Sequence, residues 1–479
     1  MALWFHWRPG RARSGLWRWN ECKKDGERTQ LGIYSYGAGK AKWKFRSNNY
    51  GAAALQCLAG SGTITIVDYS RRYERALVGI LFFTWGTVFL DRMSQLYLAP
   101  YFAPVFRLND QQIGFLASIV SIAWAFGSLV FGAISDRFGR RKILIPAVLF
   151  FSALSWISGL ARSFHELLAI RALIGLAEGP CWVAIGALLE QSSHLSRRGR
   201  NVGIVTSGAA LVGLFGAPIL TTQIASRFGW RWGFFVTGIP GLLLALLIWK
   251  YIKEPEPTAA VVALHKRGTQ LSHYFSILRY RNIWLTAIGA GGFISWLFLQ
   301  NTFAPLLITR DMHQDPRTAG FLLGAAGLGS FFMGLVLPSV SDRVGRKPTL
   351  LALAAISSLL PLALLVRPLY SHLWLLAAIL FVTQGGQAVA ALVIVLIPAE
   401  SVPPELVGTA IGMVNMVGEL IGATVAPTLG GTLAESHGLG TTMLMATGGM
   451  VLLLLVVPFL KETVHPRSRT APSDVAAFL

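Results

Sequence analysis

The sequence predicts an all-α membrane protein whose twelve transmembrane helices form two pseudo-symmetric six-helix bundles. The first observation is composition: of 479 residues, 53% are apolar and only 13% are charged, and the mean hydropathy is +0.55. A soluble protein usually carries about 25% charged residues. The second observation is a series of apolar blocks, each near the length of about 20 residues that crosses a bilayer. The third is that landmarks of the first half recur in the second.

The segment 1–75 is basic and has no sustained apolar run. It shows no secretory signal, because Arg11 and Arg13 stand where a signal peptide needs an apolar stretch. We expect residues 1–75 to be a disordered cytoplasmic tail, or an artefact of a start codon placed too far upstream.

Charge, cysteines and motifs exclude several classes of function. A net charge of +20 suggests nucleic acid in a soluble protein. Here the basic residues lie in tails and loops, so no nucleic-acid partner is expected. Cys22, Cys57 and Cys181 form no CxxC pair, which predicts neither a disulfide framework nor a metal site. No catalytic triad, metal-ligand cluster or nucleotide-binding loop stands out, so we expect no enzyme and no cofactor.

Twelve apolar blocks follow the tail. In lipid a backbone must satisfy its own hydrogen bonds, so each block is predicted to be a helix. Pro and Gly within them, such as Pro180 and Gly213, are tolerated in membrane helices. The predicted spans are 76–100, 112–134, 143–162, 166–190, 201–224, 230–251, 284–308, 318–340, 349–367, 373–398, 406–431 and 441–460.

The loops predict orientation and domain boundaries. Basic residues are more numerous in the loops after even-numbered spans, which places those loops and both termini in the cytoplasm. The expected location is the cell membrane, inner or plasma, with the lipid bilayer as partner and the chain as a monomer. The predicted parts are a six-helix bundle at 76–251, a cytoplasmic linker at 252–283, a second bundle at 284–460 and a cytoplasmic tail at 461–479.

The two halves share landmarks at matching places. Asp136–Arg141 follows the second span, and the similar Asp342–Lys347 follows the eighth. Ala217-Pro218 in the fifth span has its counterpart in Ala426-Pro427 in the eleventh. This pattern indicates a duplication, with parallel repeats about an axis normal to the membrane and a solute path between them.

A few ionisable residues lie inside predicted spans. A charge at mid-bilayer costs roughly 2.5–3.5 kcal/mol on insertion scales, so it usually faces a cavity or a partner. Arg171 and Glu178 are seven residues apart and share one helix face. Asp91 and Arg92 diverge by about 100° around their helix, so they need not pair with each other. Glu419 lies in the eleventh span and either lines the cavity or packs against a polar neighbour.

These residue types fit the coupled movement of an anion. Arg92 and Arg171 fit anion binding, since arginine stays charged and grips a carboxylate with two donors. Asp91 and Glu178 fit proton coupling, since a carboxylate in a dehydrated site can exchange a proton. The alternative is a buried salt-bridge network between the first and fourth spans that only stabilises packing.

Amide and aromatic side chains are further candidates for the cavity wall. Amides can hydrogen-bond a hydroxylated solute, and aromatic rings can stack on a ring or sugar face. The alternatives are interhelical hydrogen bonds, worth about 0.6 kcal/mol each, and ordinary aromatic packing. The candidates are Gln300, Asn301, Gln384, Gln387, Asn415, Tyr97 and Trp182.

The loop motif resembles a signature of the major facilitator superfamily, and its second copy stands where that family's repeat implies. Arg171-x-x-x-Gly175 resembles another signature of the same superfamily. We expect the charged loop residues to act in gating rather than in solute binding, the alternative being topology alone. The gating candidates are Gly132, Asp136, Arg137, Gly139, Arg140, Arg141, Asp342, Arg343, Gly345, Arg346 and Lys347.

The charged pattern within the spans resembles the anion:cation symporter family more closely. That resemblance implies Asp91 and Glu178 as protonation sites, Arg92 as carboxylate binder and Arg171 as modulator of the Glu178 charge. The chain departs from the family at Met93-Ser94-Gln95, because many members carry an Asn two residues after Asp-Arg. The same residues also resemble Spinster-type carriers, some of which export lipids.

Three functions remain open at this point. The leading one is a secondary active transporter that couples proton symport to a small organic anion, such as a sugar acid, an aromatic acid or another carboxylate. The alternative is a proton-coupled exporter of hydrophobic compounds or lipids. A third is a membrane receptor or sensor on the same fold, for which the tail is the only support.

Overall fold

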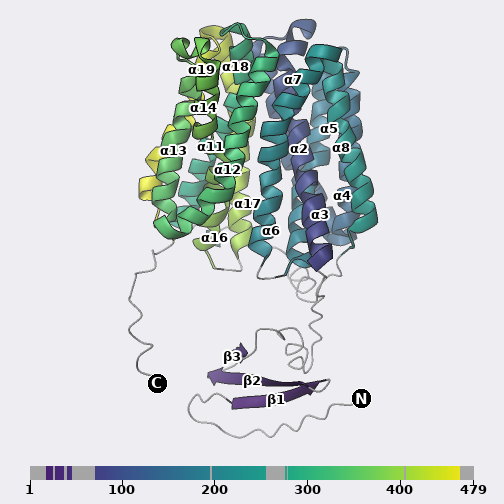
Figure 1. Cartoon of the computed structure of the whole chain (residues 1–479), viewed down its shortest axis with the longest axis vertical. Helices are drawn as coiled ribbons and strands as arrows, with labels where there is room; N and C mark the ends of the chain where they lie inside the picture. The colour runs from purple at the N-terminus through teal and green to yellow at the C-terminus, as the bar shows by residue number, and fades with distance from the viewer. Residues whose placement is uncertain are drawn as a thin grey trace. The chain divides into compact units, whose positions relative to one another are not determined.

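The computed structural model describes residues 18–24, 27–36, 40–45, 71–194, 197–254, 276–277, 279–403 and 406–463. The chain divides into two compact units. Among the described residues, the first unit holds a three-stranded antiparallel sheet in the order β1-β2-β3, and the second holds the helices (Figure 1). Most of the predicted linker 252–283 and of the tail 461–479 lies outside the described residues.

The sheet lies in the segment that was expected to be disordered. Its strands are Arg18–Lys24 (β1), Glu27–Tyr36 (β2) and Lys40–Phe45 (β3). Lys24 pairs with Glu27, so two residues, Asp25 and Gly26, separate the first two strands. Asp-Gly between strands is a strong sequence signal for a two-residue hairpin. The prediction rested on the absence of apolar runs and of known motifs in this segment and did not consider the hairpin signal.

The first six-helix bundle matches the first six predicted spans, with its first helix beginning five residues earlier than expected. The fifth span is continuous but contains a π-helical segment, η1. The elements are α2 (Arg71–Phe106), α3 (Asp110–Phe138), α4 (Arg140–Gly159), α5 (Phe164–Ser192), α6 (Arg198–Gly208), η1 (Ala209–Gly216), α7 (Ala217–Phe228) and α8 (Trp230–Tyr251).

The second bundle repeats this plan. Its eleventh span contains the π-helical segment η5, and its tenth is broken after α14. The elements are α11 (Arg281–Arg310), α12 (Pro316–Val344), α13 (Arg346–Ala363), η2 (Arg367–Ser371), α14 (Leu373–Thr383), α15 (Gly386–Ala390), η3 (Ala391–Leu396), α16 (Ile397–Glu400), α17 (Val407–Gly418), η5 (Glu419–Val425), α18 (Ala426–His437), α19 (Gly440–Val456) and η6 (Val457–Phe459).

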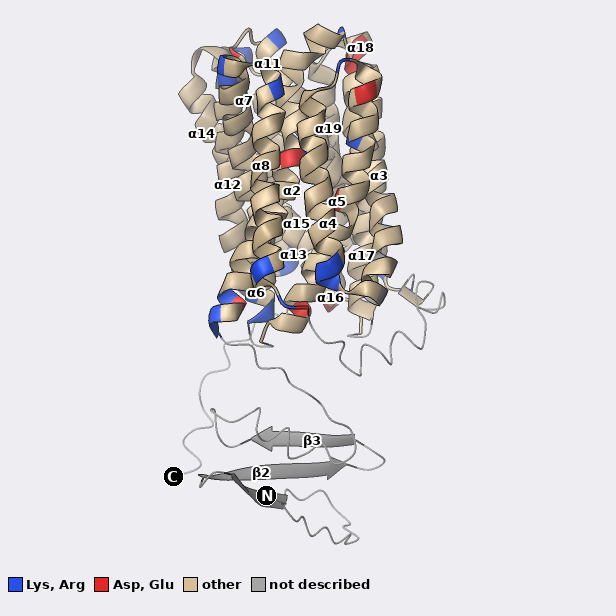
Figure 2. Cartoon of the chain, turned by 90° about the vertical axis from the view of Figure 1, so that its right-hand side faces the viewer, with Lys and Arg blue, Asp and Glu red and all other residues tan. Residues whose placement is uncertain are grey.

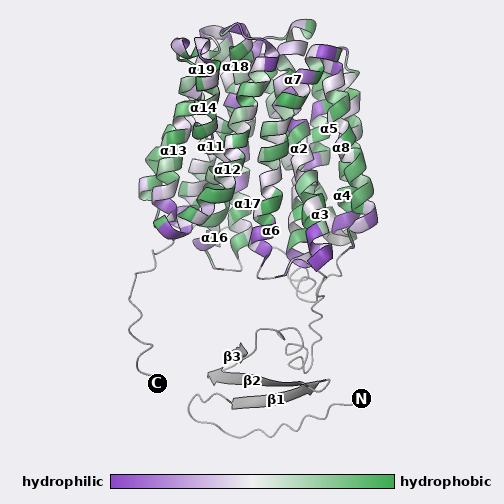
Figure 3. Cartoon of the chain, viewed as in Figure 1, coloured by the Kyte–Doolittle hydropathy of each residue, from purple (hydrophilic) through white to green (hydrophobic). Residues whose placement is uncertain are grey.

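Length and composition agree with a chain that crosses a membrane many times. Within the described residues, ten helices are long and apolar enough to do so. Figure 3 shows hydrophobic residues along the helices and hydrophilic ones mainly at their ends. Figure 2 shows the charged residues gathered at the two ends of the helical unit, with few between them. The prediction of an all-α membrane fold with twelve helical spans is confirmed.

Local sequence explains where several helices begin. Asn109 and Gln112 form a capping box at the start of α3, with the Gln112 amide donating to the Asn109 side chain at 2.8 Å. Ser163 accepts from the Glu166 amide at the start of α5. Gly139 and Gly345 both have φ of +110°, a value that favours glycine at the turns before α4 and α13.

The two ends of the helical unit are named here for later use. The end at which α3 passes into α4, and α12 into α13, carries Arg140, Arg141, Arg346 and Lys347 and is called the basic end. The end at which α2 passes into α3, and α11 into α12, is called the opposite end.

The bundles pack tightly at and near the opposite end. A Cβ built on Gly114 of α3 would lie 2.1 Å from the Pro427 carbonyl oxygen of α18. A Cβ on Gly327 of α12 would lie 2.1 Å from the Leu214 carbonyl oxygen of η1. Toward the basic end, by contrast, a Cβ on Gly203 or Gly412 would meet nothing within 4 Å. Glycine at positions 114 and 327 therefore permits the close contact of the two bundles.

Gly114→Ala places a methyl group against the Pro427 carbonyl, where there is no room. We expect it to destabilise this arrangement by about 1–3 kcal/mol, the usual cost of overpacking. Thermal unfolding of the purified protein measures the change. Gly412→Ala is the matched control and should be neutral or slightly stabilising, since its surroundings are open and alanine favours a helix. Equal stability of Gly114→Ala and wild type would contradict this close contact.

Candidate functional site

A fully buried ion pair joins the first and fourth spans. An Nη1 nitrogen of Arg171 on α5 lies 3.0 Å from an Oδ2 oxygen of Asp91 on α2, and both side chains have no exposed surface. The Arg171 guanidinium also lies 4.6 Å from the centre of the Phe234 ring on α8. The Asp91–Arg171 pair thus fastens α2 to α5 inside the first bundle.

Arg92 lies at the seam between the two bundles. Its Nη2 nitrogen donates to Ser121 of α3 at 2.6 Å and to Glu419 of η5 at 3.1 Å. Its guanidinium lies 5.6 Å from the Trp124 ring centre of α3 and 4.8 Å from that of Phe298 on α11. Each bundle therefore contributes one aromatic ring and one oxygen ligand to the same cation.

Neighbouring positions on α2 thus serve different partners. Asp91 and Arg92 point about 100° apart around the helix, as their adjacent positions require. Asp91 pairs inside the first bundle, while Arg92 pairs across the seam with Glu419. The expectation that the two residues need not pair with each other agrees with this geometry.

Glu178 is completely buried on α5, and neither of its side-chain oxygens makes a hydrogen bond to the described protein atoms. The charges of Asp91, Arg92 and Arg171 act on its carboxyl group. Buried polar atoms are nearly always hydrogen-bonded, so a buried carboxyl without a partner needs an explanation. Ionisable groups of this kind within membrane spans are concentrated at functional sites.

Two of the predicted amides lie on α11. The Tyr97 hydroxyl of α2 donates to Asn301 Oδ1 at 2.6 Å, across the seam. The Asn301 amide nitrogen donates in turn to the Leu297 carbonyl at 2.7 Å. The adjacent Gln300 is buried, and neither of its side-chain polar atoms makes a hydrogen bond among the described residues. Tyr97 and Asn301 are therefore brought together, and Gln300 is left without a partner.

The other two amides of this group flank the break in the tenth span. Gln384 stands between α14 and α15, and its Oε1 makes no hydrogen bond to the described atoms. The Ser357 hydroxyl accepts a hydrogen bond from the backbone N–H of Gly385 at 3.2 Å. The Ser330 hydroxyl accepts one from the backbone N–H of Gln387 at 3.0 Å. Serines of neighbouring helices thus satisfy the backbone that the break releases, as a span in lipid requires.

Two further candidates have different surroundings. Trp182 is half-buried and stacks on Trp85, with ring centres 4.6 Å apart, so it packs within the first bundle. Asn415 is half-buried on α17, one turn before Glu419. The structure therefore brings Asp91, Arg171, Glu178, Arg92 and Glu419 into one group, whereas the ring contact of Trp182 is with Trp85.

The first copy of the loop motif begins α4. Gly139 has a positive φ, and the Glu254 carboxylate accepts from the Arg140 amide at 2.6 Å and from the Arg141 amide at 3.0 Å. The Arg141 side chain also donates to the Trp249 carbonyl. These contacts hold the start of α4 to the end of α8 within one bundle. The surroundings of three gating candidates are not among those that the structure describes: Gly132, Asp136 and Arg137.

The second copy has the same construction. Gly345 precedes α13, and the Glu462 carboxylate accepts from the Arg346 amide at 2.9 Å and from the Lys347 amide at 3.0 Å. A carboxylate at a helix N-terminus is favourable because it satisfies free amides and meets the positive end of the helix dipole. In both copies, therefore, a glutamate carboxylate caps the helix that the motif begins.

Side-chain ion pairs of the second copy also stay within its bundle. Arg346 lies 2.7 Å from Asp342 and 2.7 Å from Glu400. Arg343 is exposed. The described contacts of this copy thus join α12, α13 and α16 and do not cross the seam.

Glu254 and Glu462 were missed by the sequence analysis. The signal was present, because Lys253-Glu254 closes the first half and Lys461-Glu462 closes the second. The landmarks compared between the two halves were the loop motif, the Ala-Pro pairs and the Ala-x-x-x-Gly pairs that follow them, and none of these includes an acid after the last span of a half. A search for acids at matching places would have found this pair.

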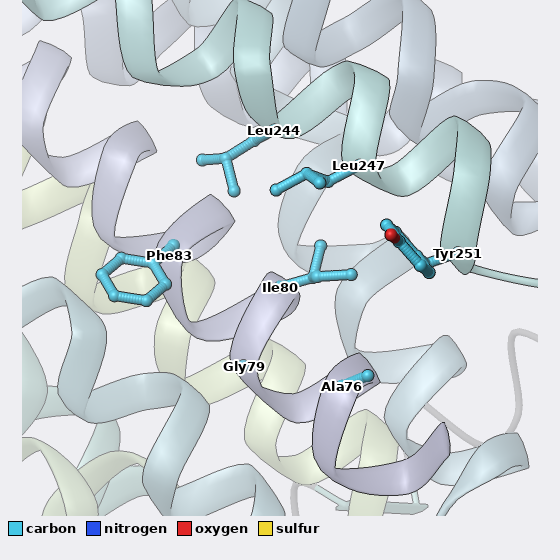
Figure 4. A pocket seen from close by; sticks show the side chains of 7 residues that line it. All are labelled: Ala76, Gly79, Ile80, Phe83, Leu244, Leu247 and Tyr251. Atoms are coloured by element: carbon cyan, nitrogen blue, oxygen red, sulfur yellow. The ribbon is translucent and has the colours of Figure 1, made fainter. Parts of the chain in front are cut away.

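An apolar groove lies apart from the charged residues. It has a volume of about 310 Å³ and lies between α2 and α8 of the first bundle (Figure 4). Leu244 and Leu247 of α8 face Ile80 of α2 across it, and Tyr251 stands at one side. Its lining has no charged or amide side chain: Ala76, Gly79, Ile80, Phe83, Leu244, Leu247 and Tyr251.

Asp91→Asn removes one partner of the buried pair and leaves the Arg171 charge uncompensated. We expect a loss of about 3–5 kcal/mol of stability, as for other buried pairs broken on one side. The control is Glu190→Gln, because the Glu190–Arg198 pair is exposed and such pairs contribute about 1 kcal/mol or less. Unfolding in detergent compares them. An equally small effect of both substitutions would show that Arg171 does not depend on Asp91.

Several transporters resemble this chain over most of their length. A "Probable 4-methylmuconolactone transporter" of Cupriavidus pinatubonensis is 27% identical over 78% of this chain and 88% of its own. The hexuronate transporter of Bacillus subtilis is 26% identical over 85% of this chain and 99% of its own. The cis,cis-muconate transport protein of Acinetobacter baylyi is 27% identical over 74% of this chain and 87% of its own.

A solved structure supports the same fold. The crystal structure of a bacterial homolog of the human lysosomal transporter Spinster has a TM-score of 0.63 and 19% identity, covering 82% of this chain and 97% of that one. The family model described as the Major Facilitator Superfamily matches residues 81–303 and 296–478. The chain therefore belongs to the Major Facilitator Superfamily, a family of transporters and not of enzymes.

Proposed function

We propose that this secondary transporter couples proton symport to the uptake of a small organic anion by alternating access. Arg92 carries this proposal, because its fixed positive charge lies between the bundles and takes ligands from both. The carrier would act as a monomer in the cell membrane, with the basic end and both termini in the cytoplasm. The positive-inside rule supports that orientation.

A carboxylate is the solute chemistry that suits Arg92 best. Arginine remains charged under all physiological conditions, and its planar group matches a carboxylate with two donors. Hexuronate and muconate, named for two relatives, are both carboxylates. The Tyr97–Asn301 pair at the seam and the adjacent buried Gln300 of α11 would bind hydroxyl or carbonyl groups elsewhere on the solute.

Proton coupling is assigned to Glu178 and Asp91. Glu178 is buried without a hydrogen-bond partner among the described residues, so a neutral, protonated form suits its surroundings. Asp91 holds Arg171, whose charge acts in turn on Glu178. One proton that moves down a pH difference of one unit supplies about 1.4 kcal/mol, enough for roughly tenfold accumulation of a monoanion.

Alternating access needs one end closed at a time. The bundles meet closely at the opposite end, where the Gly114 site contacts Pro427 and Arg310 lies 2.7 Å from Asp110. Toward the basic end, Gly203 and Gly412 are exposed, and a Cβ built at either meets nothing within 4 Å. We assign the two loop motifs to closing that end in the alternate state, since each already fixes a helix start at the basic end.

The second candidate is a proton-coupled exporter of hydrophobic compounds or lipids, to which the apolar groove between α2 and α8 gives limited support. An exporter of that kind needs an apolar route that opens to lipid. The groove lies within one bundle, so rocking of the bundles would not carry its contents across. Flux of labelled carboxylate and of labelled phospholipid, measured in the same proteoliposomes, distinguishes the two functions.

Glu178→Gln should abolish uphill uptake driven by a pH gradient and leave solute counterflow intact, because the amide keeps the shape but carries no exchangeable acidic proton. Proteoliposomes loaded with D-glucuronate or cis,cis-muconate measure both activities. Asp91→Asn is tested in parallel. Unchanged proton-driven accumulation in both variants would rule out these residues as coupling sites.

Arg92→Ala should weaken carboxylate binding by about 10–100-fold, the range for a hydrogen-bonded charge. Titration calorimetry measures the affinity, and the melting temperature checks that the variant is folded. Arg231→Ala is the control, because Arg231 stacks on Trp230, with its guanidinium 4.4 Å from that ring centre, and is not among the seam residues. Normal affinity in a folded Arg92→Ala variant would remove Arg92 from the binding site.

A further inference from the structure

Among the described residues, the second bundle contributes the Glu419 carboxylate to the surroundings of Arg92 at the seam. Glu419 begins η5, and its Oε2 oxygen lies 3.1 Å from Arg92 Nη2. Aligning Ala217-Pro218 with Ala426-Pro427 matches Glu419 to Ala210 of η1. The repeat supplies no acid at the matching place, so this carboxylate is a departure that belongs to the second half alone.

We propose that Glu419 occupies the Arg92 guanidinium in the solute-free carrier and that the carboxylate of the solute must displace it. This inference rests on the proposed function, in which Arg92 binds the solute. Glu419 is then a specificity-determining residue: it holds the place that an anionic solute takes.

The geometry around Arg92 leaves room for few anionic ligands. The rings of Trp124 and Phe298 lie near the guanidinium, at 5.6 and 4.8 Å between ring centre and Cζ. Ser121 and Glu419 already share the Nη2 nitrogen, and the buried Nε makes no hydrogen bond among the described residues. An incoming carboxylate that grips the guanidinium through two donors and uses Nη2 therefore competes directly with Glu419.

Electrostatics prevents both carboxylates from sharing the site. Two negative charges about 4 Å apart repel by about 4 kcal/mol at an effective dielectric constant of 20. In the region that the structure describes, Arg92 is the cation that pairs with Glu419. Its other neighbours at the seam, Ser121, Trp124 and Phe298, carry no charge. Binding of the solute thus requires Glu419 to leave Arg92.

Displacement has two consequences for transport. A solute without a negative charge cannot replace Glu419, so the pair selects against uncharged analogues of the same shape. The Arg92–Glu419 pair also joins α2 to η5 across the seam. When the solute displaces Glu419, this ion pair between the bundles is broken. The contact between the bundles at Arg92 then depends on the solute, so binding is coupled to bundle movement.

The test compares anion affinity in Glu419→Gln and in Asp110→Asn. Glu419→Gln keeps the shape and removes the competing charge, so affinity for D-glucuronate and cis,cis-muconate should rise about tenfold, as when a binding-competent state is freed. Binding of uncharged D-glucose should not change. Asp110→Asn removes an ion pair that joins the bundles away from Arg92, with Arg310 at 2.7 Å, and should leave anion affinity within about twofold.

Titration calorimetry on the full-length purified protein supplies these affinities. Unchanged or weaker anion binding in folded Glu419→Gln would overturn the inference, and so would an equal gain in Asp110→Asn, which would assign the effect to bundle movement. Should Glu419→Gln not fold, Glu419→Asp serves instead, because its shorter side chain withdraws from Arg92 and predicts a smaller gain. Wild type that binds neither carboxylate would refute the proposed function itself, whereas wild-type binding with no gain in the variants refutes only the displacement.

Discussion

The cost of holding an ionised side chain inside a bilayer constrains this molecule more than any other single factor. Each buried charge must find a partner or a wet cavity. Asp91 and Arg171 solve the problem together at 3.0 Å inside the first bundle, with no exposed surface. Arg92 is instead paired across the seam, with a hydrogen bond to Ser121 of the first bundle and one to Glu419 of the second. The charge of Arg92 is therefore neutralised only while the two bundles are arranged so that Glu419 reaches it.

The two halves of the chain are built alike, and the candidate site is formed by residues at which they differ. In each half, a glutamate that follows the last span accepts hydrogen bonds from the first amides of a helix: Glu254 in the first half and Glu462 in the second. Each half also has a π-helical segment directly before an Ala-Pro pair. Segments of π-helix are frequent at functional sites. Among the candidate site residues within the spans, by contrast, most of the charged ones lie in the first half, and the second half contributes mainly amides. Glu419 is the acid that crosses this division.

Hydropathy and repeats predicted the twelve spans because each depends on local composition, and they also identified Asp91, Arg92, Arg171 and Glu178 as the buried ionisable residues. The partners were harder to predict. The pairing of Arg92 with Glu419 joins residues far apart in the chain and depends on how the bundles meet, which no local pattern encodes. The break beside Gln384 likewise depends on serines from other helices. The sheet and the capping acids did have local signals that a closer comparison would have found.

The central claim is that the bundles exchange their contacts between two ends while an anion binds between them. Distances between spin labels at Gly203→Cys and Gly412→Cys, with the native cysteines replaced, test it most directly, because a Cβ at either position meets nothing within 4 Å. We predict that saturating D-glucuronate at acidic pH shifts the population toward a shorter distance across the basic end. An unchanged distance distribution in protein that transports D-glucuronate would contradict the claim.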